Sequence, residues 1–285
     1  MKCLIQGRAK YLPYQDDSVR LTNLGMLRRL RTDFGSHFFS GDAFMIVIGL
    51  ETSGLVGSVA LLRDGELLAE RSLGEAGRRH AQSLVLELHD LLQSHGAKPH
   101  DVQVIAVSKG PGSFTGLRVG LVCAKTFAYA TGCQFVAVDT FEALADNCPL
   151  EVRDVWIVEN AQRGDFFVGR YARDEAGRLR QAGPIQTVVA EGWLAARMAD
   201  ETITGPGLAH ADLQSVRARL LTDEAFARPR AGAIAKLGQH RLLDRDATSP
   251  PDDFDFWKAV PFYIRPSAAE EQRAKRSEAS GEPNS

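Results

Sequence analysis

The sequence lacks the residue patterns that hold a structural metal or a disulfide framework. Its 285 residues include seven histidines and four cysteines, yet no two histidines stand at i and i+4 and no cysteines form a C-x-x-C pair. Zinc sites and redox motifs require such spacings, so neither is predicted. We interpret the cysteines as reduced thiols of a cytosolic protein. They are Cys3, Cys123, Cys133 and Cys148.

Long apolar runs and a strong net charge are also missing. No run reaches the length of a membrane span, so no membrane association is expected. The formal net charge is −2, whereas proteins that bind a nucleic-acid backbone are usually basic, so any contact with RNA is expected to be local or made through a partner. Neither a G-x-S-x-G elbow nor a G-x-x-x-x-G-K-[ST] loop occurs, which leaves no self-contained catalytic signature.

The two ends of the chain differ from its middle. Residues 1–44 mix basic, acidic and aromatic side chains with no sustained period, and a regular strand pattern begins only at Met45. We interpret this segment as a disordered extension or an upstream mis-start, with a localisation or interaction arm as the alternative. Residues 267–285 are charged and poor in large apolar side chains, which predicts a disordered tail.

Between these ends the pattern indicates two α/β units in tandem. The first, residues 45–149, has three strand patterns, an amphipathic helix at 79–95, and then strand, helix, strand and short helix. The second, residues 150–266, repeats this order in weaker form. We therefore predict two domains with mixed sheets. A ligand cleft is expected where the carboxyl ends of their strands meet.

The stretch SKGPGSFTGLRVG, residues 108–120, joins a strand to a helix through a glycine turn. A helix start of this kind offers backbone N–H groups to an anion, but it also lets another backbone come close. Gly116 and Gly120 favour close packing, because small residues then recur every four positions along the helix. The turn ETSG after the first strand can be interpreted either as a phosphate contact or as a plain turn of small polar residues. The candidate phosphate or nucleotide contacts are Thr52, Ser53, Gly110, Gly112, Ser113, Gly205 and Gly207.

The helices at 79–95 and 113–130 are predicted to lie side by side and to present a partner-binding surface. The second is apolar nearly all round, so it is buried either within its own fold or against another subunit. The first carries a wide leucine face, and His80 at its start also suits a metal ligand, a base or an ordinary helix start. The residues assigned to the surface are His80, Leu84, Leu86, Leu88, Phe114, Gly116, Arg118, Gly120 and Val122.

Five segments, in order, resemble the TsaB/YeaZ family of bacterial tRNA threonylcarbamoyladenosine biosynthesis. They are IGLETSGLVGSVAL, RRHAQSLVLELHDLL, AVSKGPGSFTGLRVG, NAQRGDFFVGRY and PFYIRP, and GPGSFTGLR is the most specific part. The resemblance implies two tandem RNase H-like domains of the acetate kinase, Hsp70 and actin (ASKHA) type. It also implies a cytoplasmic protein that pairs with a TsaD-like catalytic sibling and, through it, with a TsaE-like ATPase and tRNA. A homodimer is expected where the sibling is absent.

The sibling family carries a metal-binding H-x-x-x-H pair on the helix that follows the strand QFVAVD in this chain. Here the matching positions are Thr140 and Leu144, and neither side chain can replace an imidazole as a metal ligand. The resemblance therefore implies a chain without catalytic residues, metal or cofactor. Its expected role is a non-catalytic scaffold for transfer of threonylcarbamoyl to N6 of adenosine 37 in tRNAs that read codons beginning with A.

A small-molecule kinase or nucleotide-binding ATPase of the same fold is the alternative function. Such enzymes hold Mg²⁺ near phosphates through acidic side chains. Glu51 ends the first strand where the family usually has Asp, whereas Asn160 and Gln162 stand where Asp and Arg are common. These departures argue against a tight nucleotide site. A metallopeptidase is disfavoured by the missing metal ligands.

Overall fold

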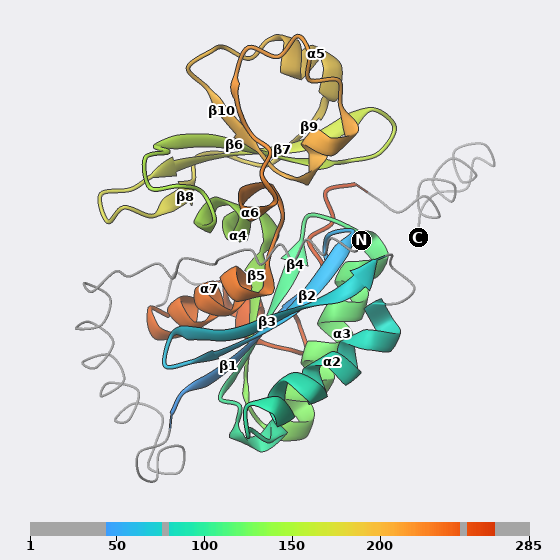
Figure 1. The fold of residues 1–285 in the computed structure, drawn as a ribbon, viewed down its shortest axis with the longest axis vertical. Helices are drawn as coiled ribbons and strands as arrows, with labels where there is room; N and C mark the ends of the chain where they lie inside the picture. Colours follow the sequence, from blue (N-terminus) through green and yellow to red (C-terminus); the bar gives the residue numbers. More distant parts are fainter. Residues whose placement is uncertain (1–43, 76–79, 246–249, 266–285) are drawn as a thin grey trace, which may run out of the picture. The chain divides into compact units, whose positions relative to one another are not determined.

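The computed structural model describes residues 44–75, 80–245 and 250–265 (Figure 1). The predicted extension, except Phe44, and the predicted tail at 267–285 lie outside the described residues. The first of two sheets has the strand order β3-β2-β1-β4-β5, with β1 antiparallel to β2 and parallel to β4. Its strands are β1 (Ile46–Glu51), β2 (Val56–Arg63), β3 (Glu66–Glu75), β4 (Val104–Gly110) and β5 (Gln134–Asp139).

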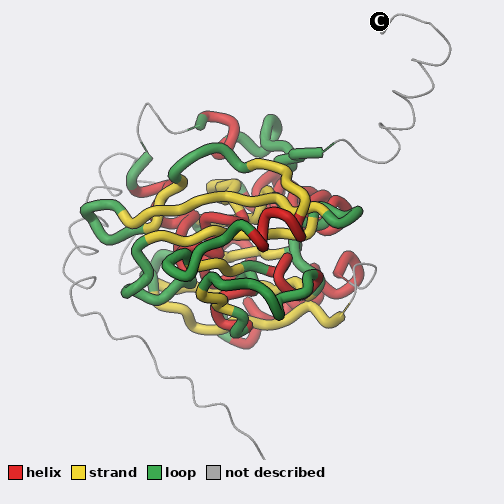
Figure 2. The backbone as a smooth tube through the Cα atoms, turned by 90° about the horizontal axis from the view of Figure 1, so that it is seen from above, coloured by secondary structure: helices red, strands yellow, loops and turns green. Residues whose placement is uncertain are grey.

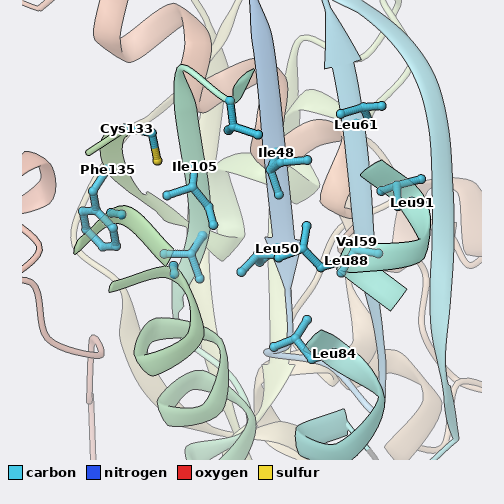
Figure 3. Packing of buried hydrophobic residues seen from close by; sticks show 14 of the residues in the cluster. Ile48, Leu50, Val59, Leu61, Leu84, Leu88, Leu91, Ile105, Cys133 and Phe135 are labelled. Carbon is cyan, nitrogen blue, oxygen red and sulfur yellow. The ribbon is translucent and has the colours of Figure 1, made fainter. Parts of the chain in front are cut away.

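The centre of the first sheet is buried on both faces. Every residue of β1 is buried, and the apolar run that precedes Glu51 favours this in a strand with neighbours on both sides. Two helices, α2 (His80–Ser94) and α3 (Phe114–Thr131), cover the face formed by Ile48 and Leu50. Figure 3 shows this packing, in which Leu88 of α2 points toward the strands.

The ends of α3 follow from residues suited to helix termini. Ser113 is the N-cap, and its Oγ accepts a hydrogen bond from the backbone N–H of Gly116 at 3.3 Å. At the other end Gly132 adopts a φ of 75°, the left-handed conformation that commonly terminates a helix. The predicted helix at 113–130 is therefore confirmed to within a residue at each end.

The second sheet has the strand order β11-β10-β6-β7-β8, and β9 also pairs with β7. Its strands are β6 (Asp154–Asn160), β7 (Asp165–Arg173), β8 (Leu179–Gln181), β9 (Gln186–Val189), β10 (Thr202–Thr204) and β11 (Arg219–Leu221). Three short helices belong to this half: α4 (Thr140–Asp146), α5 (Ala190–Ala195) and α6 (Glu224–Ala227). Two apolar clusters form its core, one containing Phe141 and Leu144 of α4 and the other containing Leu194 of α5.

The last helix, α7 (Ala231–Leu243), follows the second sheet in the chain but packs on the first. It lies against Gly49 of β1 so closely that a Cβ at this glycine would overlap the carbonyl oxygen of Ala231. Gly238 of α7 approaches Ala106 of β4 in the same way. The first sheet is thus covered on its second face by a helix from the later part of the chain. The predicted domain boundaries, 45–149 and 150–266, stay predictions.

The described residues confirm the predicted α/β class with two mixed sheets. Figure 2 shows the strands in yellow with helices in red beside and between them. No helix in the described part has both the length and the apolar character needed to cross a bilayer.

Candidate functional site

A cleft of about 1480 Å³ opens between the first and second sheets of the described region. Its walls come from the turns that follow β1, β4, β6 and β10, together with the end of the described chain. The main lining segments are residues 53–56, 111–115, 159–163, 205–206 and 262–265. The strand ends therefore meet at a cleft, where the sequence predicted one.

The glycines of SKGPGSFTGLRVG bring α3 against the backbone that follows β1. A Cβ at Gly116 would overlap the carbonyl oxygen of Thr52, and one at Gly120 would overlap the Thr52 hydroxyl. A Cβ at Gly112 would lie 2.7 Å from the Ser53 carbonyl oxygen. The backbone N–H of Ser113 donates to that same oxygen at 2.7 Å. Close packing thus accounts for Gly112, Gly116 and Gly120, and Ser53 occupies one of the N–H groups that an anion would use.

The second glycine turn has the same relation to β6. Gly205, with a φ of 120°, lies so close that a Cβ would overlap the carbonyl oxygen of Val158. A Cβ at Gly207 would lie 3.1 Å from the backbone of Glu159. Gly110 has a φ of 112°, and a Cβ there would lie 3.0 Å from the carbonyl oxygen of Phe262. In both halves the glycine turns hold the end of the first strand in place.

Glu51 is fully buried at the carboxyl end of β1. Its Oε1 accepts hydrogen bonds from the backbone N–H and the hydroxyl of Ser53, both at 2.5 Å. Its Oε2 has no hydrogen-bond partner among the described residues. Burial raises the pKa of this carboxyl, although the bonds from Ser53 act in the opposite direction.

Glu159 is a second buried carboxyl in the cleft, and the sequence analysis missed it. The residue is 8 % exposed and lines the cleft near the end of β6. Its Oε1 accepts from the backbone N–H of Asn160 at 2.8 Å, while its Oε2 lacks a partner within the described ranges. Burial raises the pKa of Glu159 from 4.5 to about 7, and the Glu51 carboxylate adds to the rise.

Asn160 and Gln162, which were compared with the Asp and Arg common in the family, lie in the turn after β6. Asn160 Oδ1 accepts a hydrogen bond from the backbone N–H of Gln162 at 2.8 Å, as in an Asx turn. Gln162 has a φ of 65° and is exposed. An acidic residue directly before Asn160 in VWIVEN was the available signal for Glu159. Burial of a strand residue cannot be read from its type alone.

The residues assigned to a partner surface divide into two sets. Leu84 and Leu88 of α2 are buried in the core of the first sheet, and the two α3 glycines face Thr52. Leu86, 58 % exposed, and Val122, 64 % exposed, point outward. Arg118 is exposed and Phe114 is partly buried, whereas the side chain of His80 lies outside the described part.

Two further exposed apolar residues extend the outward set. Val85 on α2 and Tyr129 on α3 are both exposed, and Tyr129 lies seven residues after Val122, on the same side of the helix. The two helices are in contact with each other. We call these four residues, Val85, Leu86, Val122 and Tyr129, the α2–α3 surface.

The two positions for which the resemblance implies metal ligands in a catalytic sibling are buried in this chain. Thr140 and Leu144 lie on α4 with no exposed surface, and Leu144 belongs to a core cluster of the second sheet. Within the described ranges no three side chains of His, Cys, Asp or Glu are placed to hold a metal ion. Burial raises the pKa of Cys123 to about 11 and that of Cys148 to about 12, so both are held as neutral thiols.

Comparison with known proteins finds relatives of this chain. The family model for TsaD, tRNA N6-adenosine threonylcarbamoyltransferase, matches residues 74–192. TsaB of Bacillus subtilis is 33% identical over 53% of this chain, and TsaB of Escherichia coli is 30% identical over 47%. These matches span 65% and 58% of the two relatives' own lengths.

Two solved structures from Pseudomonas aeruginosa resemble the fold over most of the described chain. One, a protein with similarity to peptidase YeaZ, has a TM-score of 0.63 at 27% identity and covers 78% of this chain and 100% of its own. The other, YeaZ, has a TM-score of 0.63 at 25% identity and covers 77% of this chain and 100% of its own. Together with the two mixed sheets, this likeness confirms the predicted ASKHA-type fold. The similarity to curated TsaB proteins and to solved YeaZ structures supports a TsaB/YeaZ identity for this chain.

Proposed function

We propose that this chain is a non-catalytic scaffold subunit of tRNA threonylcarbamoyladenosine biosynthesis. In this role it positions a TsaD-like catalytic sibling for transfer of threonylcarbamoyl to N6 of adenosine 37, in tRNAs that read codons beginning with A. Relatives named as tRNA threonylcarbamoyladenosine biosynthesis protein TsaB support the process. A TsaE-like ATPase joins through the sibling, and tRNA contacts this chain only through the complex. The cytoplasm, where tRNA is modified, is the proposed location.

The α2–α3 surface is the observation that carries this proposal. It places exposed aliphatic and aromatic side chains on two adjacent helices, including Leu86 and Val122. Exposed apolar side chains that gather into one patch usually mark a protein interface. The TsaD family model matches part of this chain, so a TsaD-like sibling is expected to have the same type of fold. Such a sibling can bind the α2–α3 surface with an equivalent pair of helices. A second copy of this chain fits the same surface when the sibling is absent.

The absence of a catalytic role is supported by the residues of α4. Thr140 cannot supply an imidazole, and Leu144 has no donor atom at all. Both side chains are also buried, so no ligand could reach the metal-binding positions without repacking the core of the second sheet. The chemistry is therefore assigned to the sibling.

Reconstitution tests this function directly. The chain is mixed with the TsaD-like and TsaE-like proteins of its own source, ATP, threonylcarbamoyl-adenylate and unmodified tRNA, and modified adenosine is measured by mass spectrometry. We expect modification with the full set, none with this chain alone, and a loss when it is omitted. Modification by this chain alone, or an undiminished yield without it, would refute the scaffold role.

A matched pair of variants connects the surface to this activity. Leu86→Glu should lower the yield, because a charge buried at an interface without a partner opposes association. Leu150→Glu is the control, since Leu150 is 62 % exposed and lies outside the α2–α3 surface. Equal yields from the two variants would place the interface elsewhere.

A second candidate, a small-molecule kinase or nucleotide-binding ATPase, is favoured by one observation. Glu51 and Glu159 each have a carboxylate oxygen without a partner among the described residues, in or below the same cleft. Oxygen atoms of this kind are ligands that Mg²⁺ prefers. Calorimetric titration with MgATP, on the parent chain and on Glu159→Gln, tests it. Binding by the parent that the variant loses supports this candidate, and no binding by the parent rejects it.

A further inference from the structure

The last described segment, residues 250–265, connects the two sheets, and the proposed function leaves it without a role. We call this segment the strap. It starts with a short 3₁₀ helix, Pro251–Phe254, and continues without regular structure. Ala259 of the strap is buried in the core of the first sheet, while Ile264 packs against a core cluster of the second. The strap therefore passes from one core to the other within a few residues.

The strap is attached to the carboxyl end of β4. Lys109 Nζ lies 2.6 and 2.7 Å from the two carboxylate oxygens of Asp253. Both side chains are largely buried, so solvent screens this ion pair less than an exposed one. The backbone N–H of Phe262 donates to the carbonyl oxygen of Lys109 at 2.7 Å. These contacts fix the strap to the start of the cleft wall.

The strap also runs beside α3, in the opposite direction. Tyr263 stacks on Phe114 with ring centroids 4.8 Å apart, and its hydroxyl oxygen accepts from Arg118 Nε at 2.8 Å. Near the other end of α3, Trp257 contacts the edge of Tyr129 with ring centroids 5.9 Å apart. One segment thus contacts both ends of the helix that carries half of the α2–α3 surface.

The far end of the strap is bound to the second sheet. Arg265 donates from Nη1 to the carbonyl oxygen of Ala161 at 2.8 Å, and its Nη2 lies 2.5 Å from Asp165 Oδ2. Ala161 and Asp165 bound the turn between β6 and β7, which lines the cleft. One guanidinium group therefore connects the strap to the wall that contains Glu159.

The outer side of the strap continues the α2–α3 surface. Trp257 is 74 % exposed and Val260 is 68 % exposed, which is unusual for large apolar side chains so close to a buried core. Trp257 touches Tyr129, a member of that surface, so the exposed apolar area passes from α3 to the strap without a break. Continuity with the proposed interface identifies the occupant as the same catalytic sibling.

We propose that the strap extends the α2–α3 surface and couples it to the cleft, so that sibling binding and attachment of the β6–β7 turn form one linked equilibrium. This inference rests on the proposed function, because it takes the sibling as the partner. A sibling that covers Trp257 holds the strap, and a held strap keeps Arg265 on the β6–β7 turn. Linkage is reciprocal, so loss of the Arg265 contacts must weaken sibling binding.

Two variants of the full chain test the coupling. Arg265→Ala removes the contacts to the β6–β7 turn. Arg219→Ala is the control, because Arg219 is exposed and its Nη2 lies 3.8 Å from Glu151 Oε1, and neither residue belongs to the strap. Sibling affinity is measured by calorimetry after circular dichroism confirms folding. Couplings between protein sites are typically about 5-fold or more in affinity. We expect a loss of that size for Arg265→Ala and none for Arg219→Ala.

Hydrogen exchange supplies a second measurement, which is made on the parent chain and on Arg265→Ala. Backbone amides of residues 161–165 should exchange more slowly in the parent chain when the sibling is bound, and this protection should be lost in Arg265→Ala. Unchanged exchange in the parent, with parental affinity for Arg265→Ala, would overturn the coupling.

A third variant, Trp257→Ala, tests whether the strap belongs to the surface. Truncation of an aromatic residue at the centre of an interface commonly costs about tenfold or more in affinity. Trp257 is exposed, so the variant should fold. If Leu86→Glu loses binding while Trp257→Ala and Arg265→Ala keep it, the strap inference fails and the proposed function stands. If Leu86→Glu also binds like the parent, the proposed interface fails as well.

Discussion

Replacement of Glu159 by glutamine should remove a loss of stability that the parent chain shows as the pH rises toward neutrality. Burial raises the pKa of this carboxyl from 4.5 to about 7 in the folded chain, and the nearby Glu51 carboxylate contributes to the rise. In the unfolded chain the carboxyl loses its proton near 4.5, so between these values the folded state binds more protons. The stability that the protonated form provides is therefore fully present below pH 4.5 and is lost as the pH rises through about 7.

The size of this loss follows from the difference between the two pKa values. A difference of about 2.5 units, at about 1.4 kcal/mol per unit, gives a loss of about 3 kcal/mol between pH 4.5 and pH 8. Glutamine has no proton to lose, so the variant should not show this decline. Its amide nitrogen lacks an acceptor at the position of Oε2, which costs about 1 kcal/mol or more at every pH. We expect Glu159→Gln to be the less stable protein at pH 5 and the more stable one at pH 8.

Urea denaturation of the full chain at a series of pH values measures both curves. Glu175→Gln serves as the control, because it changes the same chemical group at an exposed position in the same half of the chain. This control should follow the parent at every pH. Parallel curves for the parent and Glu159→Gln from pH 5 to pH 8 would refute the reasoning, because Glu159 would then be ionised in the folded chain at neutral pH.

Three further predictions concern the glycines, the surface and the chain start. Gly116→Ala should lower the free energy of unfolding by about 2 kcal/mol in urea denaturation, because the new Cβ would overlap the Thr52 carbonyl oxygen. Gly192→Ala on α5 is the control. A Cβ there meets open space, so this variant should be neutral or up to about 1 kcal/mol more stable. Leu86→Glu and Val122→Glu should each fold, as both positions are exposed, and lose sibling binding by about tenfold or more in calorimetry; parental affinity in both would exclude the α2–α3 surface. A chain that begins at Met45 should melt at nearly the parental temperature in differential scanning calorimetry, and a large drop would mean that residues 1–44 pack on the fold.

The strands and helices with a strong hydrophobic period were predictable from the sequence. β1 and β4 each begin with an apolar run because both faces of these strands are covered, and α2 carries leucines at helical spacing. The short strands β9 and β11 were not predicted, since three or four residues leave too little pattern to separate a strand from a loop. The return of α7 to the first sheet depends on contacts between distant residues, such as Gly49 with Ala231, which no local pattern contains.

Helix periodicity alone could have separated the buried from the exposed residues of the candidate surface. Leu84 and Leu88 are four residues apart and share a face, whereas Leu86 lies two residues from each and about 200° around the helix. These three leucines could therefore not form one surface, and the structure places Leu86 alone on the outside. On α3 the glycines face Thr52, which leaves Val122 and Tyr129 for the opposite face. A partner that binds α3 therefore meets a helix whose inner side is locked against the turn after β1, so any movement of that turn must also move the interface.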